Sequence, residues 1–167
     1  MSAPKIPLMV VLIVVFELVS SPVFAVIVPP PVDNQDARVL LQAAIDQCEA
    51  GGIVQLLPGV YRIASTLHLR SNMKFHGTDE TTIQFTGETP GVMLDLSDCE
   101  EVEVFDISLD GANNPNTTQG VFAHNARRLN LHHLVIRNLV KGTGFGPHGI
   151  LFAGKNSTKE MGVTDSV

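Results

Sequence analysis

An internal repeat constrains the fold of this chain more than any other feature, because the sequence aligns with itself at a shift of 27 residues. Apolar residues coincide with apolar residues throughout the alignment. The coinciding positions are Leu94 and Leu96 with Val121 and Ala123, Val102 and Val104 with Leu129 and Leu131, and Ile107 and Leu109 with Leu134 and Ile136. A repeat of about 20 to 50 residues holding several short strands is typical of a solenoid, whose coils stack about 4.8 Å apart. We therefore expect a stack of β-coils.

Short segments with period-two alternation extend this pattern upstream to Gly52. They cover residues 54–56, 67–69, 73–75 and 83–85, and turn-forming pairs such as Pro58-Gly59 separate them. Gly120 and Gly149 are expected to open later coils.

One amphipathic helix precedes the strands. Its expected apolar face consists of Ala37, Leu40, Leu41, Ala44, Ile45 and Cys48, which recur at helical spacing. We expect the helix over about residues 36–50, with Asp33, Asn34 or Asp36 as its N-cap. Gly51 is the left-handed residue on which it would end.

Residues 36–77 resemble the N-terminal start of the pectate lyase superfamily. The matching positions are residues 41–45, Gly51-Gly52, Leu57-Pro58-Gly59, Tyr61 and residues 67–77. The resemblance implies an all-β, right-handed, single-stranded parallel β-helix, the pectin lyase-like solenoid, with the N-terminal helix as its cap. It also implies action on acidic polysaccharide by lyase, glycoside hydrolase or epimerase chemistry, and it is the only reason to consider calcium as a cofactor.

The chain is expected to divide into three parts. Residues 1–25 have a basic residue, an apolar run and a small-residue cleavage signal, as in a secretory signal peptide. Residues 26–35, with three consecutive prolines, are expected to be an extended linker, and residues 36–167 the cap and about four and a half coils. The last residues resemble the start of another strand, which predicts a chain truncated at its C-terminus. We expect the mature protein to be secreted or periplasmic and not held in a membrane.

Charge is unevenly distributed along the chain. Residues 26–119 carry 14 acidic and 4 basic residues, for a net charge of −10, whereas residues 120–167 carry 2 and 6, for +4. One interpretation makes the basic residues, among them Arg127, Arg128 and Lys141, a surface for an acidic polysaccharide. The competing interpretation follows from the repeat, which places Glu100 and Glu101 below Arg127 and Arg128, and Asp110 below Arg137, as a ladder of ion pairs. An acidic exported chain without an aromatic stacking platform is not expected to bind nucleic acid.

The segment Gly144-Phe145-Gly146-Pro147-His148-Gly149 has the strongest catalytic character. It resembles the Phe-Asp-Pro-His turn of exported mannuronan epimerases, with Gly146 at the position of the aspartate. His148-Gly149-Ile150 also resembles a Gly-His-Gly-Ile run of polygalacturonases, although the paired upstream aspartates are missing. These resemblances make His148 a candidate catalytic residue. The outward Arg137 that precedes the segment is the second candidate, because Arg137 or Lys141 would neutralise the carboxylate of a uronate. A solvated or hydrogen-bonded turn histidine is the structural alternative.

Metal binding is not indicated by the residues themselves. His132 and His133 are expected to point to opposite sides of a strand, so that they cannot share an ion, and Asp95, Asp106 and Asp110 lie on different strands or turns.

Cys48 and Cys99 lack metal-ligand spacing and are expected to be unpaired, one of them buried. Asn116 and Asn156 have the form of glycosylation acceptors.

Two classes of function remain open from the sequence. The chain is either an exported polysaccharide-processing enzyme, or the N-terminal part of one, or a non-catalytic β-helix that binds glycans or builds a surface structure. The missing aspartates favour the second class for this chain, and the superfamily resemblance favours the first for its full-length form.

Overall fold

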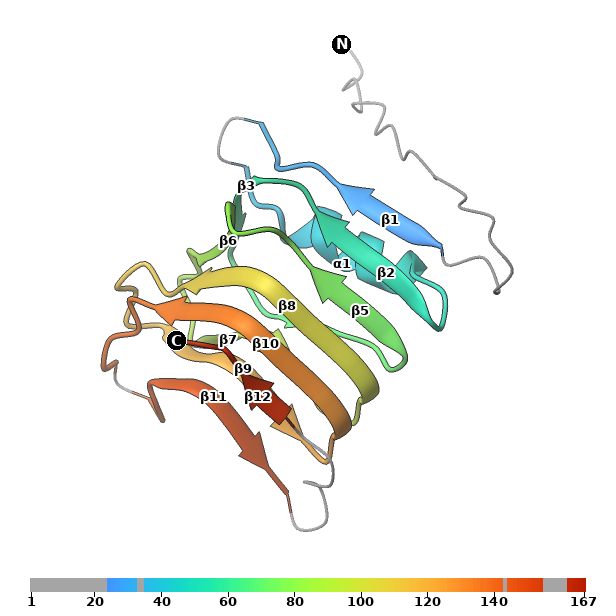
Figure 1. The fold of residues 1–167 in the computed structure, drawn as a ribbon. Helices are drawn as coiled ribbons and strands as arrows, with labels where there is room; N and C mark the ends of the chain where they lie inside the picture. The colour runs from blue at the N-terminus through green and yellow to red at the C-terminus, as the bar shows by residue number, and fades with distance from the viewer. Residues whose placement is uncertain (1–23, 33–34, 143, 155–161) are drawn as a thin grey trace, which may run out of the picture.

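The structure, a computed structural model, describes residues 24–32, 35–142, 144–154 and 162–167. The chain winds into a right-handed parallel β-helix of about five turns, which confirms the expected fold. Its strands stack in parallel, and the helix α1 (Arg38–Gln47) lies behind β1 and β2 at the N-terminal end (Figure 1). No helix in the described residues is long and apolar enough to cross a membrane.

Two parallel sheets run along the solenoid (Figure 1). The larger contains, in spatial order, β1 (Ala25–Val28), β2 (Gly52–Leu56), β5 (Met73–His76), β8 (Glu100–Asp110), β10 (Arg127–Arg137) and β12 (Gly162–Thr164). β3 (Gly59–Ile63) and β6 (Thr81–Phe85) join it through β8. The smaller contains β11 (His148–Ala153), β9 (Thr117–His124), β7 (Gly91–Asp95) and β4 (Leu67–His68).

The long strands β8 and β10 each turn a corner and so contribute to two faces. The first half of β8 pairs with β5, and its second half pairs with β6. The corner residue is Asp106, at φ 54°, and His133 has φ 51° at the same place in β10. Aspartate and histidine are among the few non-glycine types enriched in this left-handed region. The 27-residue repeat therefore recurs in the backbone as well as in the side chains.

Strand pairing confirms the predicted register. Leu129 lies opposite Val102 and Leu134 opposite Ile107 in the β8–β10 pair, and Val121 lies opposite Leu94 in the β7–β9 pair. Each of these six side chains is at most 1% exposed. Like residues therefore stack on like inside the solenoid, and the shared core that results holds the turns together.

The helix is shorter than expected, because it ends at Gln47 and Cys48 is already extended. Its last carbonyls are satisfied from outside the helix: Arg70 Nη1 donates to Asp46 O at 2.6 Å and to Cys48 O at 3.4 Å. The N-cap is Ala37, without a side-chain cap, so the prediction of Asp36 at this position is wrong by one residue; Asp36 still accepts a hydrogen bond from Arg38 N at 2.9 Å. The other two predicted caps, Asp33 and Asn34, lie outside the described residues. Gly51 has the expected positive φ, at 82°, but the helix does not end on it, because Cys48 is the C-cap.

The expected linker over residues 26–35 begins instead as a strand of the sheet. Val26 lies opposite Val54 and Val28 opposite Leu56 in the β1–β2 pair, and Val28 is 2% exposed. The apolar residues before the prolines thus cover the first full turn of the solenoid. The predicted signal peptide falls mainly on residues 1–23, outside the described part of the chain.

Both cysteines are unpaired and both are buried, whereas only one was expected to be buried. Cys99 Sγ donates to Leu69 O at 3.3 Å, and burial raises the pKa of this thiol to about 11. Burial also raises the pKa of Cys48. Neither thiol therefore has the character of a reactive cysteine.

Candidate functional site

The turn before β11 carries two predicted site residues, Lys141 and His148. Lys141 Nζ donates to Gly146 O at 3.1 Å, and His148 begins β11 two residues later. The ring of His148 packs against Phe145, with 4.9 Å between centroids, and Phe145 is 72% exposed. Within the described residues, Nδ1 of His148 is buried without a hydrogen-bond partner. The histidine therefore retains an unused polar atom beside an exposed aromatic ring.

The predicted arginines are held by carboxylates of the preceding turn. Arg137 Nε lies 3.4 Å from Asp110 Oδ2, and Arg127 Nη2 lies 3.1 Å from Glu100 Oε2. Arg128 pairs with both Glu100 and Glu101. The structure thus contains the ladder of ion pairs that the repeat predicted as the alternative to an open basic surface.

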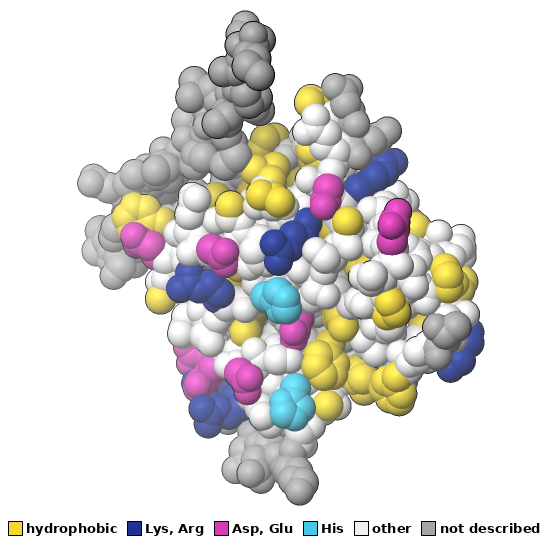
Figure 2. All heavy atoms as spheres, turned by 180° about the vertical axis from the view of Figure 1, so that it is seen from behind, with side chains coloured by type: hydrophobic (Ala, Val, Ile, Leu, Met, Phe, Trp, Pro, Cys, Tyr) yellow, Lys and Arg dark blue, Asp and Glu magenta, His cyan; other side chains and the backbone are white. Residues whose placement is uncertain are grey.

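Charges of both signs are also mixed on the opposite side of the molecule, where Figure 2 shows basic and acidic side chains interspersed. A polyanion would therefore find local cationic groups and no continuous basic field.

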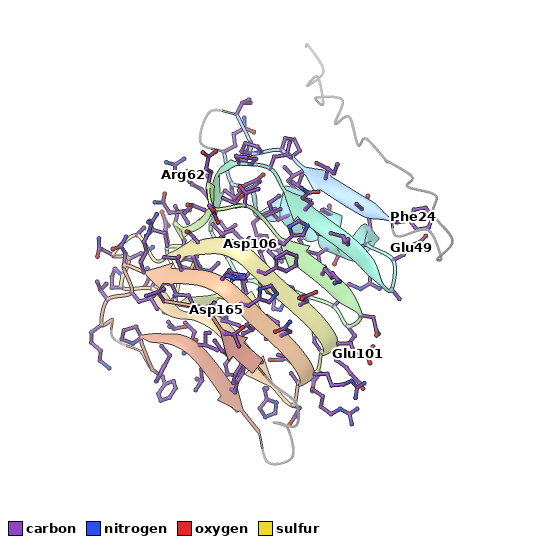
Figure 3. All side chains as sticks on the ribbon, viewed as in Figure 1. Phe24, Glu49, Arg62, Glu101, Asp106 and Asp165 are labelled. Carbon is purple, nitrogen blue, oxygen red and sulfur yellow. The ribbon has the colours of Figure 1, made fainter. Side chains whose placement is uncertain are left out.

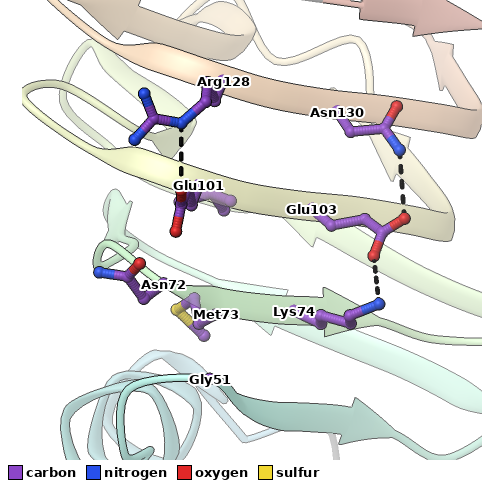
Figure 4. Close-up of a pocket in the computed structure, with 9 residues that line it drawn as sticks. Gly51, Asn72, Met73, Lys74, Glu101, Glu103, Arg128 and Asn130 are labelled. Atoms are coloured by element: carbon purple, nitrogen blue, oxygen red, sulfur yellow. Dashed lines mark hydrogen bonds and ion pairs between the residues drawn. The ribbon is translucent and has the colours of Figure 1, made fainter.

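An open hollow of about 360 Å³ lies on the outward face of β5, β8 and β10. Its lining includes Lys74, Glu101, Glu103, Arg128 and Asn130 (Figure 4). Three of these side chains form a row that crosses successive turns. Lys74 Nζ lies 2.7 Å from Glu103 Oε2, and Asn130 Nδ2 donates to Glu103 Oε1 at 3.1 Å. We call this hollow, together with the row of side chains that crosses it, the groove.

Glu103 is the polar centre of the groove. A hydrogen bond from Lys74 lowers the pKa of its carboxyl most strongly. Burial raises this pKa, but contacts with His132 lower it as well, so the net pKa lies below its usual value. His132 Nε2 lies 3.1 Å from Glu103 Oε1. Because an ionised carboxylate only accepts hydrogen bonds, His132 donates from Nε2. Each side chain of the row is thereby held by its neighbours in a defined position.

A column of three rings stands beside the groove. His76 and Phe105 stack with 4.5 Å between centroids, and Phe105 and His132 with 4.9 Å. The rings come from β5, β8 and β10, at equivalent places in successive turns. The column forms an aromatic edge along the groove.

The expectation that His132 and His133 point to opposite sides is wrong. Their Nδ1 atoms lie 2.9 Å apart, because the left-handed conformation of His133 interrupts the alternation of the strand at the corner. His133 Nδ1 also lies 3.6 Å from Asp106 Oδ1. A continuous chain of polar contacts thus runs from Lys74 through Glu103 and the histidine pair to the corner, where Figure 3 labels Asp106.

The aspartates considered as calcium ligands lie apart from one another in the described residues. Asp95 accepts hydrogen bonds from Ser97, Asp110 is tied to Asn138 and Arg137, and Asp106 lies apart at the corner. In the described part of the chain, no group of three or more His, Cys, Asp or Glu residues is placed to hold a metal ion.

The two predicted glycosylation acceptors differ in what the structure describes. Asn116 Nδ2 donates to Gly87 O at 3.3 Å, and Asn156 lies outside the described residues.

The groove was missed by sequence reasoning, although part of its signal was available. The 27-residue shift pairs Glu103 with Asn130 and Phe105 with His132. Lys74 lies opposite Glu103 at a spacing of 29 residues, because the circuit of the solenoid from β5 to β8 is longer than the 27-residue circuit from β8 to β10. A search at a fixed spacing of 27 residues therefore pairs Glu103 with Asn130 and misses Lys74.

Comparison with known proteins agrees with the fold. No family model and no curated protein sequence matches the chain. Among solved structures, the chain is similar to the A-module of the mannuronan C-5 epimerase AlgE4 from Azotobacter vinelandii, with a TM-score of 0.51 and 20% sequence identity. The likeness covers 79% of this chain and 46% of that chain, so the chain spans about half the length of this relative. At this identity the likeness establishes the β-helix fold alone.

Proposed function

We propose that this protein is an exported β-helix that binds an acidic polysaccharide, a uronic-acid polymer, along the groove. The observation that carries the proposal is the row of Lys74, Glu103 and Asn130, which presents one hydrogen-bonding side chain per turn along an open hollow. A polymer lying along the solenoid would meet one of these side chains at each of three successive turns. The structural likeness to a mannuronan epimerase supports a polysaccharide as the ligand class.

Lys74 and Arg128 are the groups that would favour an acidic polymer over a neutral one. Both line the groove, and both are also bound to carboxylates of the protein, Glu103 and Glu101. A uronate that reaches Lys74 must share its ammonium group with Glu103. Binding should therefore be moderate in strength and should weaken as salt screens the charges.

Equilibrium binding tests this proposal with three polymers: polygalacturonate, polymannuronate and the neutral glucan dextran. We expect at least one polyuronate to bind and dextran to bind less. Lys74→Met should weaken polyuronate binding about tenfold, since a hydrogen bond to a charged group contributes about 1.5 kcal/mol or more. Gln84→Ala, on the second face of the solenoid, is the matched control. Equal binding of dextran and polyuronate, or an unchanged Lys74→Met variant, would remove the proposal.

A catalytic function is a second candidate, and the unpaired Nδ1 of His148 favours it. In this proposal His148 exchanges a proton with a uronate unit through Nε2, because Nδ1 is buried, and Lys141 or Arg137 would bind the carboxylate of that unit. Arg137 would first have to leave Asp110.

Assays of the same polyuronates for unsaturated products, reducing ends and epimerised units test for lyase, hydrolase and epimerase activity. Turnover that is lost in His148→Ala, with polymer binding retained, would support catalysis at this turn. Binding without turnover would leave a non-catalytic glycan-binding protein.

A further inference from the structure

A second hollow lies around the corner from the groove. It has a volume of about 230 Å³ and sits on the second face of β8 and β10, next to the left-handed residues of the corner. Its lining includes Thr78, Asp79, Asp106, Ser108, His133 and Val135. We call this site the corner hollow.

The chemistry of the corner hollow differs from that of the groove. Two carboxylates, two hydroxyl groups and one imidazole line it, together with Val135, which is 39% exposed, and no lysine or arginine does. Within the described residues, neither Asp79 nor Asp106 accepts a hydrogen bond through its carboxylate, and Asp106 Oδ1 lies 3.6 Å from His133 Nδ1. Ionised carboxylates are acceptors only, so a ligand must bring hydrogen-bond donors.

We propose that the corner hollow is a second carbohydrate-binding subsite, for a sugar unit that donates hydrogen bonds and carries no negative charge. A sugar ring offers hydroxyl donors along its edge and C–H groups on its faces, which suits a hollow lined by two carboxylates and an exposed valine. An amino group would add a charged donor, which binds carboxylates more strongly than a neutral one. A uronate would place its carboxylate near Asp79 and Asp106, and like charges repel.

The corner hollow is connected to the groove through the histidine pair. His133 lines the hollow, and its Nδ1 lies 2.9 Å from Nδ1 of His132, whose other nitrogen contacts Glu103 in the groove. This inference rests on the proposed carbohydrate-binding function and extends it. A branched glycan would lay its acidic main chain in the groove and a neutral or amino-sugar branch in the corner hollow.

The test compares glucose, glucosamine and glucuronate, which share one ring and differ in a neutral, cationic or anionic substituent. Amide chemical shifts are followed in ¹⁵N-labelled protein during titration with each sugar. We expect shifts at Ser108, His133 and Val135, with affinity falling from glucosamine to glucose to glucuronate. Glucuronate affinity equal to that of glucosamine, or shifts confined to other regions, would overturn the proposal.

Asp79→Asn combined with Asp106→Asn removes both charges with little change of shape. Asparagine tolerates the left-handed conformation of residue 106, so the variant should fold. We expect glucosamine affinity to fall about tenfold or more. Glu80→Gln, which removes an exposed charge next to Asp79, is the control and should bind as the parent does. Unchanged glucosamine binding in the double variant would overturn the proposal.

The two proposals fail separately. If no polyuronate binds but glucosamine still shifts the signals of the corner hollow, the function proposed for the groove is wrong and the subsite stands. If polyuronate binds and depends on Lys74 while none of the three sugars affects the hollow, the subsite is wrong and the groove stands.

Discussion

Replacing Tyr61 by phenylalanine tests how the first turn of the solenoid is fastened. Tyr61 is fully buried in β3, and its hydroxyl lies 2.7 Å from Val28 O and 2.9 Å from Leu57 O. Burial holds the pKa of this phenol above its usual range, so the group stays a donor. The contact with Val28 joins β3 to β1, the strand at the edge of the sheet.

The loss of stability in Tyr61→Phe depends on the hydrogen bonds that the carbonyls of Val28 and Leu57 keep in the variant. A hydroxyl has one proton and donates fully to one acceptor at a time. Val28 O still accepts from Leu57 N at 2.9 Å, and Leu57 O still faces Thr81 Oγ1 at 3.4 Å. Neither carbonyl is left without a donor, so we expect Tyr61→Phe to lower the free energy of unfolding by about 1 kcal/mol. Tyr61→Ala also opens a cavity and should cost about 3–5 kcal/mol.

Urea unfolding followed by far-UV circular dichroism measures both variants, because the chain has no tryptophan and one tyrosine. Amide exchange in β1 gives a local readout, and it should accelerate in Tyr61→Phe. A loss above about 3 kcal/mol for Tyr61→Phe would show that a carbonyl is left unpaired. No loss at all would show that the hydroxyl bond contributes nothing, and either result would refute the reasoning.

Three further predictions concern polar and aromatic contacts between turns. Burial raises the pKa of Asp110. Hydrogen bonds from Asn138 and the Ala112 amide, together with Arg137, lower this pKa by more than burial raises it, so the net pKa lies below its usual value. Its stabilising contribution should be present above about pH 4 and should be lost as pH falls through the lowered folded-state pKa; Asp110→Asn should remove that dependence from acid-unfolding curves. A double-mutant cycle on Glu100 and Arg127 should give a coupling energy below about 1 kcal/mol that shrinks with added salt. Phe105→Leu keeps an apolar side chain but breaks both ring stacks, and should lower the free energy of unfolding by about 1–3 kcal/mol in urea titrations.

The fold could be predicted largely because its core repeats. Inward residues such as Val102 and Leu129 must be apolar in every turn, so the same apolar pattern recurs in the sequence. The recurrence predicts which residues lie opposite each other in neighbouring turns. The ion pair of Asp110 with Arg137 could be predicted for the same reason, since outward residues at one register also stack.

The candidate site could be predicted only in part, because its contacts depend on the corners. The period of two implies that His132 and His133 diverge, and only the positive φ of His133 brings their rings together. Asparagine, aspartate and histidine are enriched at left-handed positions, but they also occur in ordinary strands and turns of this chain, so sequence alone does not locate the corner. Lys74 was missed for a different reason, namely that the length of an intervening turn shifted its spacing.

The alignment of Arg127 directly above Glu100 has a consequence for how such a molecule can change in size. Residues 100–126 make one complete circuit, after which Arg127 N bonds to Cys99 O at 2.9 Å and the path begins again. A tandem copy of this segment would therefore enter the solenoid as an additional layer, with its own left-handed corner at the duplicate of Asp106 and matching neighbours above and below. The protein is in this sense modular, and a single in-frame duplication could lengthen its groove by one step while leaving every other layer intact.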